Sequence, residues 1–351
     1  MRVWIDILTP KQLLFFKPFI EDLKAKGHLT LVTSRRYREV EGLSGLMGVN
    51  PRYIGQHGGA SRLGKLSAST ERIHDLLDLV SDWAPDKAIS FSSPECSRVA
   101  YGLGIQNICV NDSPHAENVA RLTIPLCDSL ATPWVIPNNA WIKFGIDKEK
   151  IIKYKALDPV AWLKRLNIQD FNIKNFEVDE SKRTIAIRVE EGFAAYLIDM
   201  DPNWVTKVID GILNKVEDCN ILVLGRYTSQ IEYLANKYGD RIIIPKEVFI
   251  GTTILTKVDI FVGMGGTMTA EASLLGVPSI SAYQGKHLYT EEYLLSQGLL
   301  FRPGSPDAIA NNVKELLRDH YFRDRLKIKS KRIMDKMEDP IAKLITIIEK
   351  K

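Results

Sequence analysis

Short apolar runs alternate with amphipathic segments along this chain, and the whole alternation occurs twice. In the first half, the apolar runs 2–8, 29–33 and 88–90 are separated by segments with helical periodicity. The same order resumes at 184–189 and continues past 260–262. Strands of a parallel sheet are covered by helices on both faces, so they read as short continuous apolar runs between helices. The chain is therefore predicted to be an α/β protein with two Rossmann-like, doubly wound domains.

A polar stretch without clear periodicity separates the two halves and sets the predicted domain boundaries. The first domain is predicted at residues 1–162, the linker region at 163–183 and the second domain at 184–330. Residues 331–351 are predicted to form a C-terminal helix that can cross back onto the first domain. A length of 351 residues is enough for two separate hydrophobic cores.

Charge and composition exclude several classes of protein. The 47 basic and 43 acidic residues are nearly balanced, whereas a dedicated nucleic-acid binder carries a concentrated basic surface. The four cysteines form no CxxC pair and do not cluster with histidines, so neither a disulfide framework nor a zinc centre is expected. No leader-like segment or membrane-spanning apolar run occurs in the sequence. We therefore expect a cytoplasmic protein, and contact with a membrane surface and the oligomeric state stay open.

The segment 260–283, IFVGMGGTMTAEASLLGVPSISAY, carries the strongest local pattern. A buried strand leads through a glycine-rich turn into a helix. The start of a helix offers unpaired N–H groups and partial positive charge, and glycines allow a phosphate to approach the backbone. Gly265, Gly266 and Thr267 are therefore predicted to bind a diphosphate, and Glu271 could accept hydrogen bonds from a ribose. The alternative is a tight turn whose glycines serve packing alone.

Other common phosphate-binding motifs do not fit this chain. The glycine spacing matches neither the P-loop nor the dinucleotide fingerprint, which argues against an ATPase of that class and against a dehydrogenase. No pair of aspartates suggests a metal-bound donor site. We expect neither a metal nor a cofactor.

The order GG, EA, G and P within residues 265–278 resembles the donor-binding element of GT-B enzymes. These include the non-hydrolysing UDP-GlcNAc 2-epimerases and the lipid-linked N-acetylglucosaminyltransferase of peptidoglycan synthesis. The resemblance implies two domains that face a central cleft, and a nucleotide-sugar as substrate. It also implies that Gly265, Gly266 and Thr267 bind the diphosphate and that Glu271 binds the ribose.

Nearly the full length also resembles a largely archaeal family, the domain-of-unknown-function family 354. The segments that carry this resemblance are VWIDILTP, IGQHGG, NDSPHAENVARLTIPLCD and the glycine element.

Two loops of the first half follow predicted strands and carry candidate residues. Lys11, in the loop TPKQ, could pair with a phosphate or lie on the surface. The epimerases carry a GTRPE-type loop at this place, so the difference argues against epimerase chemistry. His57, in GQHGG, resembles the epimerases' GQH tripeptide and is flanked by glycines, so it is expected to be exposed. It could act as an acid, a base or a sugar ligand, or have no role.

A third loop, NDSPHAE, combines Asp112, His115 and Glu117 at a strand end, and Arg121 follows one turn later. Such a density of titratable groups is typical of catalytic or sugar-binding loops. Asp112 lies where the epimerases place a catalytic glutamate, and ENVAR resembles their EEANR segment. Alternatively, Asp112 caps a helix and the others are solvated.

In the second half, four further residues follow predicted strands or precede helices. Arg188 and Arg226 are placed to meet a diphosphate, because a guanidinium forms paired hydrogen bonds with phosphate oxygens. Phe249 lies where GT-B proteins often read the base through the backbone, and His287 follows the strand after the glycine element.

These features favour a metal-independent GT-B glycosyltransferase with a nucleotide-sugar donor, preferably a UDP-sugar. The catalytic candidates are His57, Asp112, His115 and Glu117. The nucleotide-sugar candidates are Lys11, Arg121, Arg188, Arg226, Phe249, Gly265, Gly266, Thr267, Glu271 and His287. Two alternatives stay open: a UDP-GlcNAc 2-epimerase-like enzyme and a non-catalytic nucleotide-sugar-binding protein. The donor base, the sugar and the acceptor are not specified by the sequence.

Overall fold

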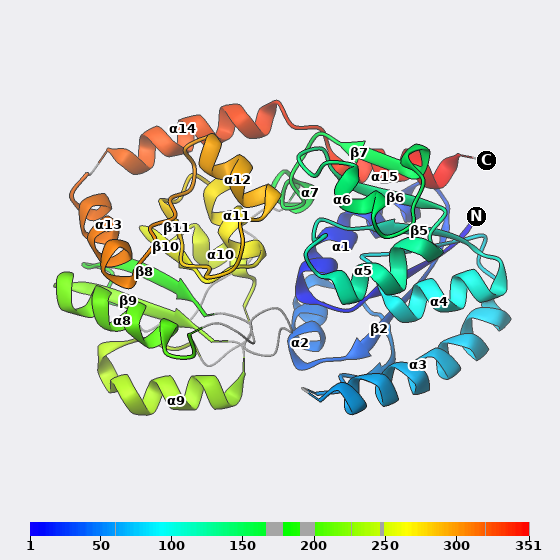
Figure 1. The fold of residues 1–351 in the computed structure, drawn as a ribbon, viewed down its shortest axis with the longest axis horizontal. Coiled ribbons are helices and arrows are strands. Elements are labelled where there is room, and N and C mark those ends of the chain that lie inside the picture. The colour runs from blue at the N-terminus through cyan, green and yellow to red at the C-terminus, as the bar shows by residue number, and fades with distance from the viewer. Residues whose placement is uncertain are drawn as a thin grey trace. The chain divides into compact units, whose positions relative to one another are not determined.

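The computed structural model describes residues 1–59, 61–165, 178–189, 201–225, 227–245, 249–319 and 321–350. The chain divides into two compact units (Figure 1). Unit 1 comprises Met1–Arg165 and Met337–Lys351, and unit 2 comprises Leu166–Lys336. Most of the predicted linker region, 163–183, lies outside the described residues.

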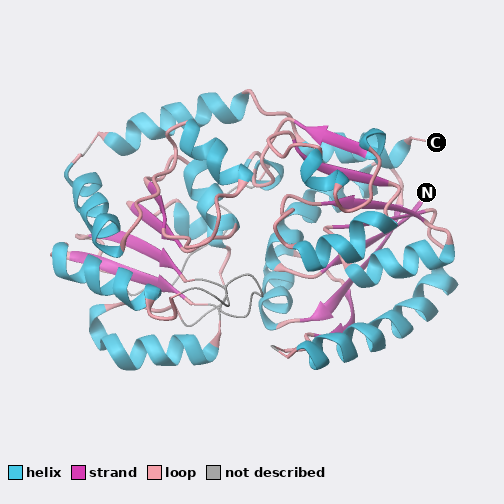
Figure 2. Cartoon of the chain, in the orientation of Figure 1, coloured by secondary structure: helices cyan, strands magenta, loops and turns pink. Residues whose placement is uncertain are grey.

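Unit 1 is built on a parallel sheet of seven strands in the order β3-β2-β1-β4-β5-β6-β7 (Figure 2). The strands are β1 (Arg2–Ile7), β2 (Leu29–Arg36), β3 (Arg52–Gln56), β4 (Lys87–Ser90), β5 (Gln106–Val110), β6 (Ser129–Pro133) and β7 (Ile151–Tyr154). The order starts at β1 and runs outward in both directions, which is the doubly wound pattern.

Helices cover both faces of this sheet (Figure 1). They are α1 (Pro10–Ala25), α2 (Arg38–Met47), α3 (Arg62–Trp83), α4 (Pro94–Leu103), α5 (Glu117–Thr123), α6 (Asn139–Ile142), α7 (Val160–Leu163) and α15 (Pro340–Glu349). Two 3₁₀ turns, Ile124–Leu126 and Lys148–Lys150, lie between them.

The alternation of side chains along β1 explains why both faces are covered. Trp4 packs against α3 and α4, where Leu76 and Val99 are buried, and neighbouring residues of a strand point to the opposite face. Val3, Ile5 and Ile7 are completely buried. Because both faces of the strand are apolar, each must be covered by helices.

A buried ion pair connects α3 to the central strand. Arg72 Nη2 lies 2.5 Å from Asp6 Oδ1, and Nη1 of the same guanidinium lies 3.1 Å from Oδ2. Asp6 is fully buried and Arg72 is 1% exposed. Removing Arg72 would leave the buried carboxylate of Asp6 uncompensated, so this pair fixes the position of α3 on the sheet.

Unit 2 has a parallel sheet in the order β11-β10-β8-β9. The strands are β8 (Arg183–Arg188), β9 (Cys219–Leu224), β10 (Ile260–Gly263) and β11 (Ser279–Ser281), and single bridges Leu222–Ile243 and Ile280–Phe301 extend both edges. The helices are α8 (Trp204–Lys215), α9 (Thr228–Tyr238), α10 (Gly251–Leu255), α11 (Thr267–Leu274), α12 (Tyr289–Ser296), α13 (Pro306–Arg318) and α14 (Phe322–Asp335), with a 3₁₀ turn at Gly239–Arg241.

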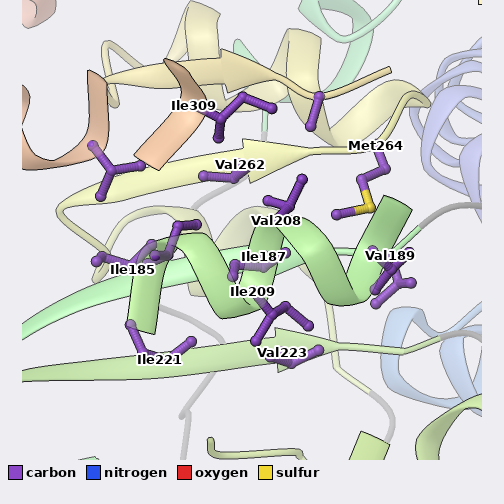
Figure 3. Close-up of a cluster of buried hydrophobic side chains, with 14 of the residues drawn as sticks. Ile185, Ile187, Val189, Val208, Ile209, Ile221, Val223, Val262, Met264 and Ile309 are labelled. Carbon is purple, nitrogen blue, oxygen red and sulfur yellow. The ribbon is translucent and has the colours of Figure 1, made fainter. Parts of the chain in front are cut away.

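The strands of unit 2 divide their side chains between two core clusters. Ile187 and Val262 face the cluster that contains Val208 of α8 and Ile309 of α13 (Figure 3). Ala186 and Phe261, their neighbours in sequence, belong to the other cluster, beneath α10 and α11. This period of two fixes the register, because a slip by one residue would exchange the two faces.

The structure differs from the sequence-based expectation in three elements. Strand β7 was not predicted, because two of its four residues are only half-buried and one of these is a lysine. The apolar run 241–244 reads as a strand in the sequence, but it forms only the single bridge at Ile243. The C-terminal helix predicted at 331–351 is divided between two helices, since α14 ends at Asp335 and Pro340 opens α15.

The described residues include no helix that is long and apolar enough to cross a membrane.

Candidate functional site

The glycine turn of unit 2 presents an uncapped helix end. Gly265 and Gly266 have φ values of +90° and +88°, a conformation that favours glycine. Gly266 is the N-cap residue of α11, and no side chain caps this helix. Among the described residues, the N–H groups of 265–268 have no protein acceptor. The turn therefore offers a row of backbone donors at the positive end of the helix dipole.

Close packing fixes the shape of this turn. A Cβ atom at Gly265 would lie 3.0 Å from Cδ2 of Tyr283, so the ring closes one side of the turn. Arg302 holds the loop of Tyr283 in place: it donates to the carbonyl of Tyr283 at 2.9 Å and to the carbonyl of Gly285. The same guanidinium pairs with Glu291. The turn is thus supported by a half-buried arginine that the sequence analysis did not single out.

Two polar side chains of α11 are buried beside the turn. Thr269 is 6% exposed, and its Oγ1 is buried without a partner among the described residues. Glu271 is 2% exposed and accepts a hydrogen bond of 2.6 Å from Oγ1 of Thr252 on α10. The carboxylate predicted to meet a ribose is therefore held by α10 in this structure.

The other unit 2 candidates differ in where the structure places them. Arg188 ends β8 directly opposite Gly263 in the register, and its Nη1 donates to the carbonyl of Gly225 at 2.8 Å. Phe249 packs against the core cluster beneath α10 and α11. His287 is exposed in the loop after β11. Arg226 lies outside the described residues. The structure therefore brings Arg188 to the same sheet edge as the glycine turn.

In unit 1, a lysine bridges two carboxyl groups at the carboxyl edge of the sheet. Lys11 Nζ lies 2.6 Å from Asp112 Oδ2 and 2.8 Å from Asp158 Oδ2. Tyr154 Oη donates to Asp158 Oδ1 at 2.6 Å. Lys11 also lies 4.2 Å from the centre of the Phe91 ring. Lys11 lies at the start of α1, Asp112 follows β5, and Tyr154 and Asp158 lie at and beyond the end of β7, so three distant segments meet here. Lys11 is thus engaged by carboxylates within its own unit.

Burial and neighbouring charges shift the pKa values of these groups in different directions. Burial raises the pKa of Asp158 to about 7, an increase that Asp112 reinforces and Lys11 opposes. Burial acts in the same direction on Asp112, but the Lys11 ammonium and hydrogen-bonding neighbours such as Ser113 together outweigh it, and the pKa of Asp112 falls to about 2. Burial lowers the pKa of Lys11, and the two aspartates more than reverse this, so the pKa of Lys11 is raised.

His115 lies in the same loop as Asp112 and is held as the neutral imidazole. Burial lowers the pKa of His115, and Asp112 opposes this only in part. The unprotonated imidazole is the form that a general base needs near pH 7.

Glu117 and Arg121 turn out to be surface residues of α5. Their side chains are 53% and 67% exposed and lie 3.6 Å apart, and Glu117 also lies 3.3 Å from Lys143 Nζ. These contacts form a solvated ion-pair group on the helix surface, next to Phe144. The structure does not bring Glu117 into contact with the Lys11 cluster.

His57 is also separated from the cluster. It stacks on Tyr37 with ring centres 5.4 Å apart, and its Nδ1 accepts from the N–H of Gly59 at 3.1 Å. His57 follows β3, and three strands lie between β3 and β5. At ~4.8 Å per strand, the two strand ends are about 19 Å apart.

The comparison with known proteins shows which family this chain belongs to. A model described as "Protein of unknown function (DUF354)" matches residues 1–348. The chain belongs to this family. It is also 30% identical over 348 residues to an uncharacterized protein of Methanocaldococcus jannaschii, MJ0665, a match that covers 97% of this chain and 95% of that protein. The resemblance to family 354 that the sequence motifs indicated is confirmed.

Solved structures show the fold of this family 354 protein. UDP-GlcNAc 2-epimerase from Neisseria meningitidis, bound to UDP-GlcNAc, superposes with a TM-score of 0.76 at 16% identity and full coverage of both chains. Spinosyn rhamnosyltransferase SpnG superposes with a TM-score of 0.63 at 15% identity, also over both full chains. The predicted α/β architecture with two Rossmann-like domains, the GT-B fold, is confirmed.

In this family 354 protein, the sequence analysis did not identify the two most deeply buried polar residues of the unit 1 site, Asp158 and Tyr154. Tyr154 is the last residue of β7, a strand that was not predicted, and Asp158 lies four residues beyond it. The pattern that could have found them is YKALDP, an aromatic and an acid flanking a strand end. Among the described residues, no group of three or more His, Cys, Asp or Glu side chains could hold a metal ion.

Proposed function

We propose that this protein is a glycosyltransferase and that unit 2 binds a nucleotide-sugar, preferably a UDP-sugar, at the glycine turn. The observation that carries the proposal is the uncapped start of α11, where Gly265 and Gly266 leave backbone donors open. Such a helix end favours a diphosphate through its N–H groups and its partial positive charge. Arg188, at the end of the neighbouring strand, supplies a full positive charge. Thr267 and Glu271 complete the proposed donor site.

Unit 1 would activate the acceptor, with His115 as the general base. A base must be unprotonated at the working pH and basic enough to accept a proton. The lowered pKa of His115 meets the first condition, whereas Asp112, whose pKa is about 2, is too weak a base to meet the second. Asp112 would stabilise the imidazolium that forms when His115 takes the acceptor proton. The sugar would then pass to the acceptor oxygen, and the diphosphate would leave on the unit 2 site.

An epimerase-like reaction is the second candidate, because a UDP-GlcNAc 2-epimerase superposes on the whole chain with a TM-score of 0.76. The two reactions differ in what they consume. An epimerase converts the nucleotide-sugar alone, whereas a transferase releases UDP when it passes the sugar to an acceptor or, slowly, to water.

The first test is a thermal-shift panel of UDP, other nucleoside diphosphates and UDP-sugars. A ligand at 100 times its Kd stabilises the folded state by about 2.7 kcal/mol, which is readily measured. We expect UDP or a UDP-sugar to raise Tm. No shift with any nucleoside diphosphate would contradict the proposal.

The second test follows UDP release and the sugar configuration in the wild type, His115→Ala and the control His74→Ala. His74 is 78% exposed on α3. We expect His115→Ala to reduce turnover about 100-fold or more, the contribution of a general base, and His74→Ala to have little effect. Conversion of UDP-GlcNAc to its 2-epimer without UDP release would favour the epimerase. Equal turnover in all three proteins would favour a non-catalytic nucleotide-sugar-binding protein.

A further inference from the structure

Helix α14 of unit 2 carries as much net charge as the whole chain. Its sequence, FRDRLKIKSKRIMD, contains six basic and two acidic residues, which gives a net charge of +4. The formal net charge of all 351 residues is also +4. The rest of the chain is therefore neutral in sum, and the excess positive charge is concentrated on this one helix of 14 residues.

Neighbouring acids pair with only two of these basic residues. Arg323 and Arg325 each form an ion pair with an aspartate outside the helix. Lys329 reaches the carbonyl oxygen of Gly298, at 3.5 Å. Among the residues that the structure describes, four basic side chains of α14 form no ion pair; they are Lys327, Lys329, Lys331 and Arg332. All four are exposed, so their charges face the surroundings of the protein.

Helix α14 lies on the outside of unit 2 and packs on it with one face only (Figure 1). Leu326 and Ser330, one turn apart, are 3% and 2% exposed. A Cβ atom at Gly276 would lie 2.5 Å from the Cα atom of Lys327, so the helix backbone is held in close contact. Ile328 follows Leu326 by two residues and is therefore rotated from it by about 200° around the helix axis. Its side chain points away from unit 2 and is 56% exposed.

The exposed face of α14 combines basic and apolar side chains. Ile328 lies within the run KIKSKR, in which four of six residues are basic. Tyr321 precedes Ile328 by seven residues, or about two turns, and is 74% exposed. Basic side chains attract anionic lipid headgroups, and apolar side chains between them enter the boundary between headgroups and acyl chains. A nucleic acid would pair with the basic side chains, but its phosphate backbone offers Ile328 no apolar surface.

We propose that α14 docks this protein on a membrane surface that contains anionic lipids. The four unpaired basic residues bind the phosphate groups of the lipids, and Ile328 and Tyr321 insert between the headgroups. The protein adsorbs to the bilayer by this helix and does not span it. The inference does not rest on the proposed function, because neither the glycine turn nor the unit 1 site takes part in the contact.

The test is co-sedimentation of the full chain with phosphatidylcholine vesicles that contain or lack phosphatidylglycerol. We expect binding only to the vesicles with the anionic lipid, and release at about 1 M salt, where charges are screened beyond ~3 Å. Each basic residue near an anionic surface strengthens binding by about fivefold. The double variant Lys327→Gln/Lys331→Gln should therefore bind the anionic vesicles about 25-fold more weakly than wild type.

Two further variants separate the position of the charge from its amount, and charge from apolar contact. Lys148→Gln/Lys150→Gln removes the same charge from an exposed turn of unit 1 and should bind the vesicles like wild type. Ile328→Asn keeps every charge of α14 and should weaken binding, because it removes the apolar side chain from the docking face. The substituted side chains are exposed, so thermal unfolding should give the wild-type Tm for each variant.

Wild-type protein that stays in solution with the anionic vesicles would overturn the inference, and so would a Lys327→Gln/Lys331→Gln protein that binds them as tightly as wild type. Tighter binding to a fluorescent RNA or DNA oligonucleotide, lost in this double variant but not in Ile328→Asn, would assign the helix to nucleic acid instead. The two proposals fail separately: a chain that ignores every nucleotide-sugar but binds the vesicles refutes the transferase and leaves the docking surface standing.

Discussion

At the residue scale, two buried threonines of unit 2, Thr269 on α11 and Thr252 on α10, differ in their hydrogen bonds. Thr269 Oγ1 has no partner among the described residues, whereas Thr252 Oγ1 donates to Glu271 at 2.6 Å. Both side chains are buried. A buried hydroxyl without a partner has lost its bonds to water and gained nothing, so the same residue type should respond in opposite ways at these two positions.

We predict that Thr269→Val stabilises unit 2 by about 1 kcal/mol, and that Thr252→Val destabilises it by about 1 to 3 kcal/mol. The first change removes a polar atom that is buried without a bond. The second leaves the buried carboxylate of Glu271 without this donor. Chemical denaturation of both variants measures the difference, and a loss of stability in Thr269→Val equal to that in Thr252→Val would refute the prediction.

The same scale shows which site residues the sequence could reveal. The glycine turn was predictable, because Gly265, Gly266 and Thr267 are adjacent and their chemistry is local. The Lys11 cluster was predictable only in part, because its members come from three distant loops. Pairing Lys11 with Asp158 requires the strand order of the whole sheet, and Asp158 follows a strand that a lysine interrupts.

At the element scale, the junction of β10 and α11 depends on a backbone conformation reserved for glycine. Gly266 has φ +88° and ψ 177°. A side chain in this region costs about 1 to 3 kcal/mol. Gly239, which ends α9 in the same unit, has φ +52°, and a Cβ atom there would meet nothing within 4 Å. Gly239 therefore serves as a matched control: a substitution there introduces backbone strain but does not affect the turn.

We predict that Gly266→Ala and Gly239→Ala both lower Tm, since each forces alanine into a positive φ. Only Gly266→Ala should also abolish the stabilisation by UDP, because its methyl group would occupy the approach to the backbone donors. Thermal shifts with and without UDP separate the two effects. An undiminished UDP response in Gly266→Ala would place the nucleotide elsewhere.

Periodicity predicted the long elements well and the short ones poorly. The sequence of residues 94–103 predicts a helix, and these residues form α4, because Ser93 caps it, Pro94 opens it and Gly104 closes it. These are strong local determinants. In contrast, residues 241–244 were expected as a strand but form a single bridge, since strand pairing depends on a partner that local sequence does not specify.

At the scale of the whole molecule, the chain completes unit 1 with a segment that follows unit 2. Helix α15 packs on α1, where Ile341, Leu344 and Ile348 are fully buried. Lys26 and Glu349 pair at 2.9 Å at the end of this contact. The core of unit 1 therefore includes residues from both ends of the sequence.

We predict two calorimetric transitions that single core substitutions move separately. Leu344→Ala should destabilise unit 1 by about 2 to 5 kcal/mol and leave the other transition in place. Ile309→Ala, at a fully buried residue of α13, should do the same to unit 2. A single transition that both variants lower would show that the units unfold together.

The position of α15 also affects the order in which the protein matures during translation. Residues 166–336 leave the ribosome before α15 does, and at 5–20 residues per second this takes on the order of ten seconds or more. During that interval the part of the α1 surface that α15 covers stays exposed, although most of unit 1 has already emerged. The unit that is translated first is therefore the last to become complete, and its nascent form is the stage at which chaperones would find the most exposed hydrophobic surface.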